Sequence, residues 1–287
     1  MNISRSQDKF EIGIVTYCRW ESLRFTLQRI GAFGWNDVPV QVIDDGSVAP
    51  PPPGFPWGEV NATLYRRPER KGYIVRRNEL AQMMTAPYYL SLDDDSFPVQ
   101  GDLNPALTWL ESNPSALATG FAVKGADEKW QIICRAEPAP TQSFIGCAHL
   151  LNRANFLALG GYDEALVHQG EETDLAAEGF KRGWGCYHLP DLIIRHEYSL
   201  VARSWSRMAY YGGRNKIVWL RKHAPTPARY VKICRAVMER IILAIKDKKF
   251  AHLSGAYDGI CAPRHIFKKS RPMSAKQYGD WKALPTM

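Results

Sequence analysis

The sequence predicts an α/β fold with a mainly parallel sheet, followed by a basic and mainly helical C-terminal extension. Short β-branched runs alternate with segments of helical spacing in the first hundred residues, and two of these runs end in aspartate clusters. After about residue 200 the pattern becomes helical and basic. Because alternating strands and helices require crossover connections, neighbouring strands should be parallel and covered on both faces. We therefore expect two parts, 1–200 and 201–287.

The elements of the first part follow from local periodicity. Leu23, Leu27 and Ile30 recur at helical spacing. The β-branched and apolar runs are typical of buried strands, and the segments between them of helices or proline-rich loops. We expect strands at 10–17, 38–43 and 88–92, and helices at 21–30 and 72–84.

The net charge of +8 is concentrated in the extension. Residues 201–287 hold 19 Lys and Arg but only 4 Asp and Glu, whereas residues 1–200 hold 18 and 25. Such a surplus favours an anionic partner: a phospholipid surface, a phosphate-bearing acceptor or nucleic acid. An apolar stripe in this part could pack a helix on the core or dock it at a membrane interface. Its members are Tyr230, Cys234, Val237, Ile241 and Ile245.

The cysteines and the N-terminal residues indicate the cellular compartment of the protein. The six cysteines show no CxxC spacing and no paired framework, which indicates reduced thiols. The first residues, MNISRSQDKF, lack the apolar core of a signal peptide, and no run approaches the roughly 18 apolar residues of a spanning helix. We expect a cytoplasmic location, with the inner face of the membrane as a candidate site of attachment.

Three consecutive aspartates, Asp93, Asp94 and Asp95, follow the run YYLSL. Each close pair of carboxylates costs about 1 kcal/mol or more in repulsion unless a cation offsets it. Mg²⁺ and Mn²⁺ prefer carboxylate oxygens and share their coordination sphere with phosphates. The triplet therefore predicts a metal and diphosphate site; the alternative is a solvated acidic turn that caps a following helix.

A second acidic cluster, VIDDGS at 42–47, ends the preceding predicted strand. Taken alone it could be an ordinary Asx turn. The carboxyl ends of parallel strands meet at one edge of the sheet, where ligands bind in α/β folds. One cluster can thus accept hydrogen bonds from a nucleoside while the other holds a metal ion.

These motifs resemble those of the family 2 glycosyltransferases, which share the Rossmann-like, nucleotide-binding A-type fold. The resemblance covers about residues 10–220 and depends on the order and spacing of several short motifs. LSGAYDGICAP at 253–263 is similar to the C-terminal end of rhamnosyltransferase-like members. The resemblance makes 1–200 the nucleotide-sugar-binding and catalytic domain. The motifs are IVTYCR, VIDDGS, RRN at 76–78, YYLSLDDDS, GGYDE at 160–164 and GEETDL at 170–175.

The resemblance also implies a donor site. Asp93 and Asp95 correspond to the family's DxD pair, with Asp95 the stronger ligand for Mn²⁺ or Mg²⁺. Lys71 and Arg77 could instead be surface cations of a helix. The residues that the resemblance places on the donor nucleotide are Thr16, Tyr17, Arg19, Asp44, Lys71, Arg77, Asp93 and Asp94.

The acceptor side of the family's site usually carries a Glu-Asp pair, and here the pair is Glu171 and Glu172. The resemblance makes Glu172 the general base, because a positioned carboxylate can take the proton of an acceptor hydroxyl. The pair could instead favour the start of a helix at 173–182. His196, after the apolar run 192–194, would complete the metal site, although a lone histidine can also be structural.

The resemblance predicts an inverting glycosyltransferase of bacterial polysaccharide or glycoconjugate synthesis. The donor would be a UDP, dTDP or GDP sugar, the acceptor a glycan or lipid-linked sugar, and we expect no nucleic acid partner. The alternative is a non-catalytic protein that binds a nucleotide sugar or a polyanion. A DxDxT phosphatase is disfavoured because Phe97 occupies the threonine position, and a nucleotidyltransferase because no glycine-rich phosphate loop follows the first strand.

Overall fold

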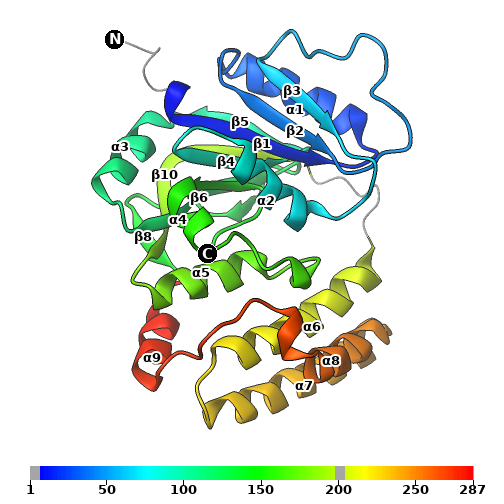
Figure 1. Ribbon diagram of the computed structural model, residues 1–287, viewed down its shortest axis with the longest axis vertical. Helices are drawn as coiled ribbons and strands as arrows, with labels where there is room; N and C mark the ends of the chain where they lie inside the picture. Colours follow the sequence, from blue (N-terminus) through cyan, green and yellow to red (C-terminus); the bar gives the residue numbers. More distant parts are fainter. Residues whose placement is uncertain (1–6, 198–203, 287) are drawn as a thin grey trace.

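The computed structural model describes residues 7–197 and 204–286. A central sheet has helices on both faces (Figure 1). Further helices at the C-terminal end of the chain pack beneath the helices of one face. The predicted α/β class with a helical extension is confirmed. The predicted boundary at residue 200 lies outside the described residues, so the division into 1–200 and 201–287 stays a prediction.

Within the described residues the sheet has ten strands, in the order β3-β2-β1-β4-β9-β6-β10-β5, with β7 beside β6 and β8 beside β10. Strands β3, β2, β1 and β4 are parallel, as is the pair of β6 and β10; the other pairs are antiparallel. Strand β3 was not predicted. The bounds are β1 Phe10–Thr16, β2 Val40–Asp44, β3 Ala62–Arg66, β4 Tyr88–Asp93, β5 Ser96–Gly101, β6 Ala116–Gly125, β7 Trp130–Ile132, β8 Ala139–Thr141, β9 Ala148–Asn152 and β10 Gly185–His196.

Each face of the sheet has its own hydrophobic core, because side chains alternate along a strand. Ile12 and Ile14 of β1 pack with α1 (Trp20–Ala32) and α3 (Asn104–Ser112). The opposite face packs with α2 (Tyr73–Met83), α4 (Arg153–Ala158) and α5 (Glu171–Lys181). There Gly13 leaves the room that the buried ring of Tyr89 fills, since a Cβ at this position would collide with it.

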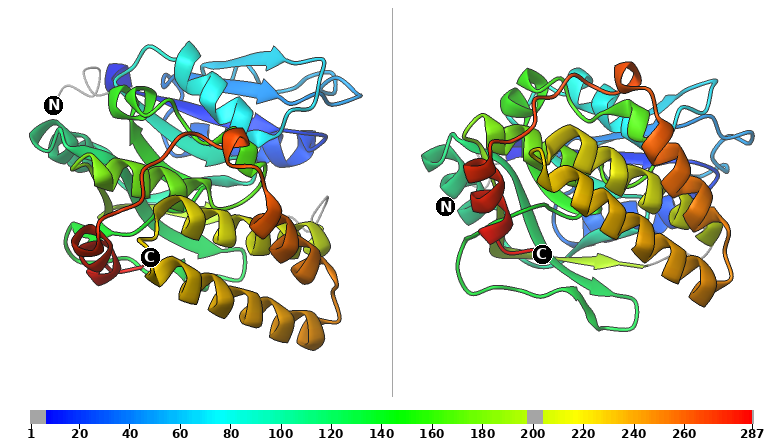
Figure 2. Two further views of the ribbon diagram at one scale, coloured as in Figure 1. Left: turned by 60° about the horizontal axis from the view of Figure 1, so that its bottom comes forward. Right: turned by 90° about the horizontal axis from the view of Figure 1, so that it is seen from below.

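The extension consists of α6 (Trp205–His223), α7 (Ala228–Asp247), α8 (Ala251–Cys261) and α9 (Ala275–Ala283). Helices α6, α7 and α8 form a layer below the sheet domain (Figure 2). Trp281 of α9 returns to α5, where its ring lies 5.3 Å from that of Phe180. Residues of the extension share the second hydrophobic core with α2 and α5. Among the described residues, no helix combines the length and the apolar character needed to cross a bilayer.

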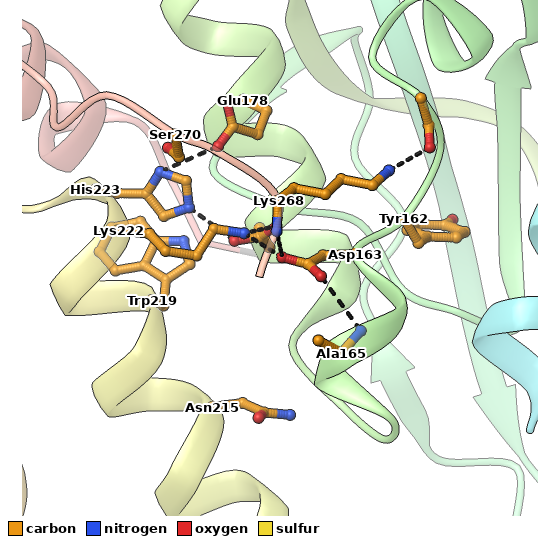
Figure 3. A network of polar contacts seen from close by, with 12 residues as sticks. Tyr162, Asp163, Ala165, Glu178, Asn215, Trp219, Lys222, His223, Lys268 and Ser270 are labelled. Carbon is orange, nitrogen blue, oxygen red and sulfur yellow. Dashed lines mark hydrogen bonds and ion pairs between the residues drawn. The ribbon is translucent and has the colours of Figure 1, made fainter. Parts of the chain in front are cut away.

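A buried group of charges, the interface cluster, joins α6 to the sheet domain (Figure 3). It consists of Asp163, Asp174, Lys222 and His223. The Lys222 ammonium donates to Asp163 at 2.7 Å and to Asp174 at 2.8 Å, and Nε2 of His223 lies 2.8 Å from Asp174. The backbone N–H of Lys268 also donates to Asp163.

Helix α7 does not turn its predicted apolar stripe to the core. Its buried residues are Arg229 and Ala236, whereas Tyr230 and Ile245 are exposed. Cys234 is exposed too, and Val237 and Ile241 are only half-buried. Val237 still packs against the second hydrophobic core, so the predicted stripe lies at the edge of the packed side, with part of it exposed.

Candidate active site

A cavity of about 350 Å³ opens at the carboxyl ends of β1 and β4. This is the edge at which α/β sheets bind ligands. Its walls come from the ends of β1, β2 and β4, from the start of α2, from the loop before α5 and from the start of α6. The lining residues are Val15, Thr16, Tyr17, Arg19, Asp45, Arg70, Gly72, Tyr73, Asp93, Asp94, His168, Gln169, Ser204, Arg207 and Met208.

Asp94 and Asp95, directly after β4, are held by the last residue of β1 and by the loop that follows it. Thr16 donates its hydroxyl to Asp94 at 2.7 Å, and Arg19 pairs with Asp94 at 3.0 Å and also with Asp95. Burial raises the pKa of Asp94 to about 7, although Arg19 and Thr16 oppose the shift. Burial also disfavours the charge of Asp95, but His196 and Arg19 outweigh it and bring the pKa well below its ordinary value.

Tyr17 and Arg70 form another wall. The Arg70 guanidinium lies 3.9 Å from the centre of the Tyr17 ring, a cation–π contact. Both line the cavity. Tyr17 was predicted to contact the donor nucleotide, and Arg70 was not.

The two aspartates after β2 have different surroundings. Asp44 is fully buried, accepts from the backbone N–H of Ser47 and from Arg66, both at 3.0 Å, and does not line the cavity. Asp45 does line it and was not predicted. Asp45 accepts from the backbone N–H groups of Lys71 and Gly72, both at 2.8 Å. The side chain of Lys71, predicted on the donor, is exposed and lies outside the cavity lining.

Arg77 joins the aspartates to the glutamates of α5. It is 3% exposed, so it is not a surface cation, and it does not line the cavity. Its Nη2 donates to Asp93 at 2.6 Å, and its Nη1 lies 3.5 Å from Glu171 and 4.0 Å from Glu172. Arg77 therefore positions carboxylates of both halves of the site. We name the carboxylates Asp93, Asp94, Asp95, Glu171 and Glu172, with Arg19 and Arg77, the cavity cluster.

Glu171 and Glu172 begin α5, directly after Gly170, whose φ is 89°. Burial raises the pKa of Glu171, and burial together with the charge of Glu171 raises that of Glu172 well above its ordinary value. The Glu172 carboxylate lies against Gly146, where a Cβ would meet its Oε1 at 2.5 Å. Glycine at 146 thus makes room for this carboxylate beside Arg77.

His196 ends β10 and faces the aspartates, with its Nε2 3.4 Å from Asp95. Burial lowers the pKa of His196, but hydrogen bonds with Asp95 and Cys147 outweigh it and raise the pKa to about 11. Potential ligand atoms of Asp93, Cys147 and His196 lie within 4.8 Å of one another. Asp95, the stronger predicted ligand, lies outside this group of three, although it is 3.4 Å from His196. The carboxylate of Asp93 with the imidazole of His196 fits a divalent ion such as Mn²⁺, whereas Mg²⁺ prefers oxygen ligands alone. Cys147 was not predicted.

The last wall combines the loop before α5 with the start of α6. Val167 and Gln169 have φ of 64° and 65°, which cost non-glycine residues about 1–3 kcal/mol each. The Asn215 amide of α6 holds this loop by donating to the carbonyls of Leu166 and His168 at 2.9 Å and of Gln169 at 2.7 Å. The sequence indicated none of these contacts, because residues of α6 and this loop are more than 30 positions apart.

Comparison with known proteins agrees with this geometry. Residues 11–146 match the family model described as glycosyl transferase family 2. This segment, just under half of the chain, is similar to the family 2 glycosyltransferases. The matched segment contains the aspartates after β2 and β4, whereas the glutamates of α5 lie beyond it. No curated protein matches the sequence of this chain.

Solved structures show the same fold at low sequence identity. GalNAc-T7 with UDP, GalNAc and Mn²⁺ is similar at 15% identity and a TM-score of 0.58, over 75% of this chain and 48% of that one, so the chain spans about half of its length. The mannosyltransferase PcManGT from Pyrobaculum calidifontis, with GDP-Man and Mn²⁺, is 16% identical with a TM-score of 0.55, over 96% of this chain and 78% of that one. S. aureus TarS 1-349 with UDP-GlcNAc is 13% identical with a TM-score of 0.57, over 90% of this chain and 82% of that one.

Proposed function

We propose that this glycosyltransferase transfers a sugar from a nucleoside-diphosphate sugar to an acceptor hydroxyl with inversion at the anomeric carbon. The observation that carries the proposal is the cavity cluster, in which Arg77 connects Asp93 with Glu171 and Glu172. Direct displacement needs a site for the leaving diphosphate and a base for the attacking hydroxyl. The cluster offers candidates for both: Asp93 lines the cavity, and Arg77 links it to Glu171 and Glu172, which lie outside the cavity lining.

The donor site of the proposal is the cavity itself. The ring of Tyr17 offers a face for a nucleobase, and the hydroxyl of Thr16 and the carboxylate of Asp45 offer polar contacts. Arg70 and Arg207 bring positive charge to the walls, as a diphosphate requires. UDP, dTDP and GDP sugars are the candidate donors; the similar structures contain UDP, UDP-GlcNAc and GDP-Man.

Asp95, Asp93 and His196 would hold the cofactor, Mn²⁺ or Mg²⁺. When bound, the ion supplies positive charge that stabilises the leaving nucleoside diphosphate. In the protein alone, Asp95 is ionised and paired with Arg19. His196 and Arg19 thereby keep a carboxylate charged that burial would otherwise neutralise.

Glu172 is the general base of the proposal. Its raised pKa makes the ionised carboxylate a stronger proton acceptor than an exposed glutamate. Arg77, 4.0 Å away, favours the ionised form before the reaction. Transfer should therefore increase as the pH rises through the pKa of this carboxyl group. The acceptor would be a glycan or lipid-linked sugar of bacterial polysaccharide or glycoconjugate synthesis.

Two substitutions separate donor binding from proton transfer. Glu172→Gln should reduce transfer by about 10²–10⁴-fold, the usual contribution of general-base catalysis, and leave nucleotide affinity unchanged. Asp95→Ala should abolish metal-dependent transfer and weaken nucleotide binding in Mn²⁺. Calorimetry with UDP, dTDP and GDP, together with product formation from the matching sugars, measures both quantities.

Transfer by Glu172→Gln at the wild-type rate would refute the assignment of the base. A wild-type protein that binds nucleotide sugars tightly but neither transfers nor hydrolyses them would instead be the non-catalytic binding protein. Inversion is checked separately by the anomeric configuration of the product, determined by NMR.

A further inference from the structure

The outward side of α7 is apolar along its whole length. We name Val231, Cys234, Met238, Ile242 and Ile245 the α7 outer face; their spacing of three and four residues places them on one side of the helix. All five are exposed, Val231 by 71% and Ile245 by 74%. A surface helix normally carries polar residues on the side opposite the core. On α7 these five apolar residues occupy that side, and the exposed charged residues stand at its borders.

The face continues toward the active-site cavity. Phe250, in the turn between α7 and α8, is 76% exposed. Next to it, the Lys249 ammonium lies 5.7 Å from the ring of Trp205, the first residue of α6. Trp205 is itself 52% exposed and stands between Ser204 and the cavity-lining turn of α6. One stretch of surface thus leads from the α7 outer face to the mouth of the cavity.

The charge at the borders of the face is positive. Arg235, Lys246 and Lys248 are exposed beside it. The acidic residues of α7 are already paired: Glu239 lies 2.6 Å from Lys216, and Asp247 lies 3.2 Å from His252. An apolar face with a cationic border matches the interface of a bilayer that contains anionic lipids. A second copy of the chain would instead bring like charges together.

We propose that the α7 outer face docks the enzyme on an anionic membrane, with α7 lying in the plane of the interface. Docking would bring the mouth of the cavity to the headgroup layer. The inference extends the proposed function, because it specifies an acceptor carried by a lipid at that surface. It requires no membrane-spanning helix, in keeping with the described residues.

Vesicle flotation tests this surface without an activity measurement. The wild-type protein should bind vesicles of phosphatidylcholine with phosphatidylglycerol more strongly than vesicles of phosphatidylcholine alone. Ile242→Asp should weaken binding by at least about tenfold, since it puts a charge where the apolar side chain of Ile242 would enter the bilayer. The matched control is Ile133→Asp, an equally exposed isoleucine of the sheet domain, which should bind as the wild type does.

A second pair tests the cationic border. Arg235→Glu with Lys246→Glu should remove the preference for anionic vesicles, whereas Lys129→Glu, an exposed lysine of the sheet domain, should not. Thermal unfolding and nucleotide binding verify that every variant is folded. Vesicle binding without any nucleotide binding would support the docking surface and refute the proposed function, so the two failures can be distinguished.

Three results would overturn the inference. The first is a wild-type protein that ignores anionic vesicles. The second is Ile242→Asp binding them as the wild type does. The third is a wild-type dimer that Ile242→Asp converts to monomers without any vesicle binding, which would identify the face as a contact between copies.

Discussion

The cavity cluster and the interface cluster are both buried groups of charges, but their donors are distributed differently. In the interface cluster every carboxylate oxygen of Asp163 and Asp174 has a donor within 3.2 Å. In the cavity cluster five carboxylates share two guanidinium groups; Thr16 and His196 add donors for Asp94 and Asp95, whereas Glu172 is no closer than 4.0 Å to Arg77. The difference is visible in the pKa values.

Burial disfavours the charge of Asp174, but His223 and Lys222 outweigh it and lower its pKa to about 2. Burial raises the pKa of Asp94 to about 7 and that of Glu172 well above its ordinary value. A buried cluster with enough donors stabilises the fold, whereas one with too few holds carboxylates ready to bind a cation or a proton. The comparison thus assigns structure to one cluster and chemistry to the other.

The largest effect is expected for Lys222→Met. The substitution leaves Asp163 and Asp174 buried without their ammonium, which should lower the free energy of unfolding by about 3–5 kcal/mol. Urea denaturation measures it. The control is Lys216→Met on the same helix, where an exposed pair with Glu239 is lost and the change should stay within about 1 kcal/mol. Equal effects of the two substitutions would contradict the structural role of the cluster.

The acid dependence of stability tests the same cluster. The folded pKa of Asp174, about 2, lies below the unfolded value of about 3.9, so its contribution is present above pH 4 and is lost as the pH falls toward 2. Lys222→Met should flatten this part of the stability profile. A profile unchanged by the substitution would show that Lys222 is not what keeps Asp174 ionised.

An intermediate effect is expected for Gly146→Ala in the cavity cluster. The added methyl group would meet Oε1 of Glu172 at 2.5 Å and Nη1 of Arg77 at 3.2 Å, so the carboxylate must move. Transfer should fall by about tenfold to a hundredfold, while nucleotide binding remains because Gly146 does not line the cavity. Gly58→Ala, with no atom within 4 Å of the new methyl group, is the control. Steady-state rates that match this control would contradict the placement of Glu172.

The smallest effect is expected for Asp94→Asn, measured as the free energy of unfolding at pH 5.5 with a chelator present. Asp94 is neutral at this pH, so replacing its carboxyl group with an amide should change the free energy of unfolding by less than about 1 kcal/mol. Because the folded pKa of Asp94 exceeds the unfolded one, its contribution to stability should fall as the pH rises from 4 through 7, and Asp94→Asn should remove that part of the slope. Asp174→Asn, which replaces an ionised group, should be clearly destabilising at the same pH. Equal losses of unfolding free energy in the two variants would contradict the different roles of the two clusters.

Local sequence patterns predicted most of the parallel half of the fold. β1, α1, β2, α2 and β4 have strong periodicity, and the structure confirms all five within a few residues. Strand β3 was missed because it is an edge strand that is only partly buried, so it lacks a clear apolar run. The insertion of the antiparallel β9 between β4 and β6 depends on long-range pairing, which local periodicity does not report.

The candidate site divides in a similar way. Residues at strand ends could be proposed because clustered carboxylates are conspicuous, and Thr16, Tyr17, Arg19, Asp93 and Asp94 do line the cavity. Which aspartate after β2 faces it could not be predicted, since the choice depends on Arg66 and Arg76 arriving from other elements. The wall from α6 was also missed, because the path of a chain after a long connection is not encoded in local spacing.

Helix α6 supplies Arg207 to the cavity, Asn215 to the strained loop and Lys222 to the interface cluster. A sheet domain cut off before this helix would lose one wall of the cavity and retain two uncompensated carboxylates. A hybrid of this chain with a similar one should therefore be joined after His223, so that α6 stays with its own sheet.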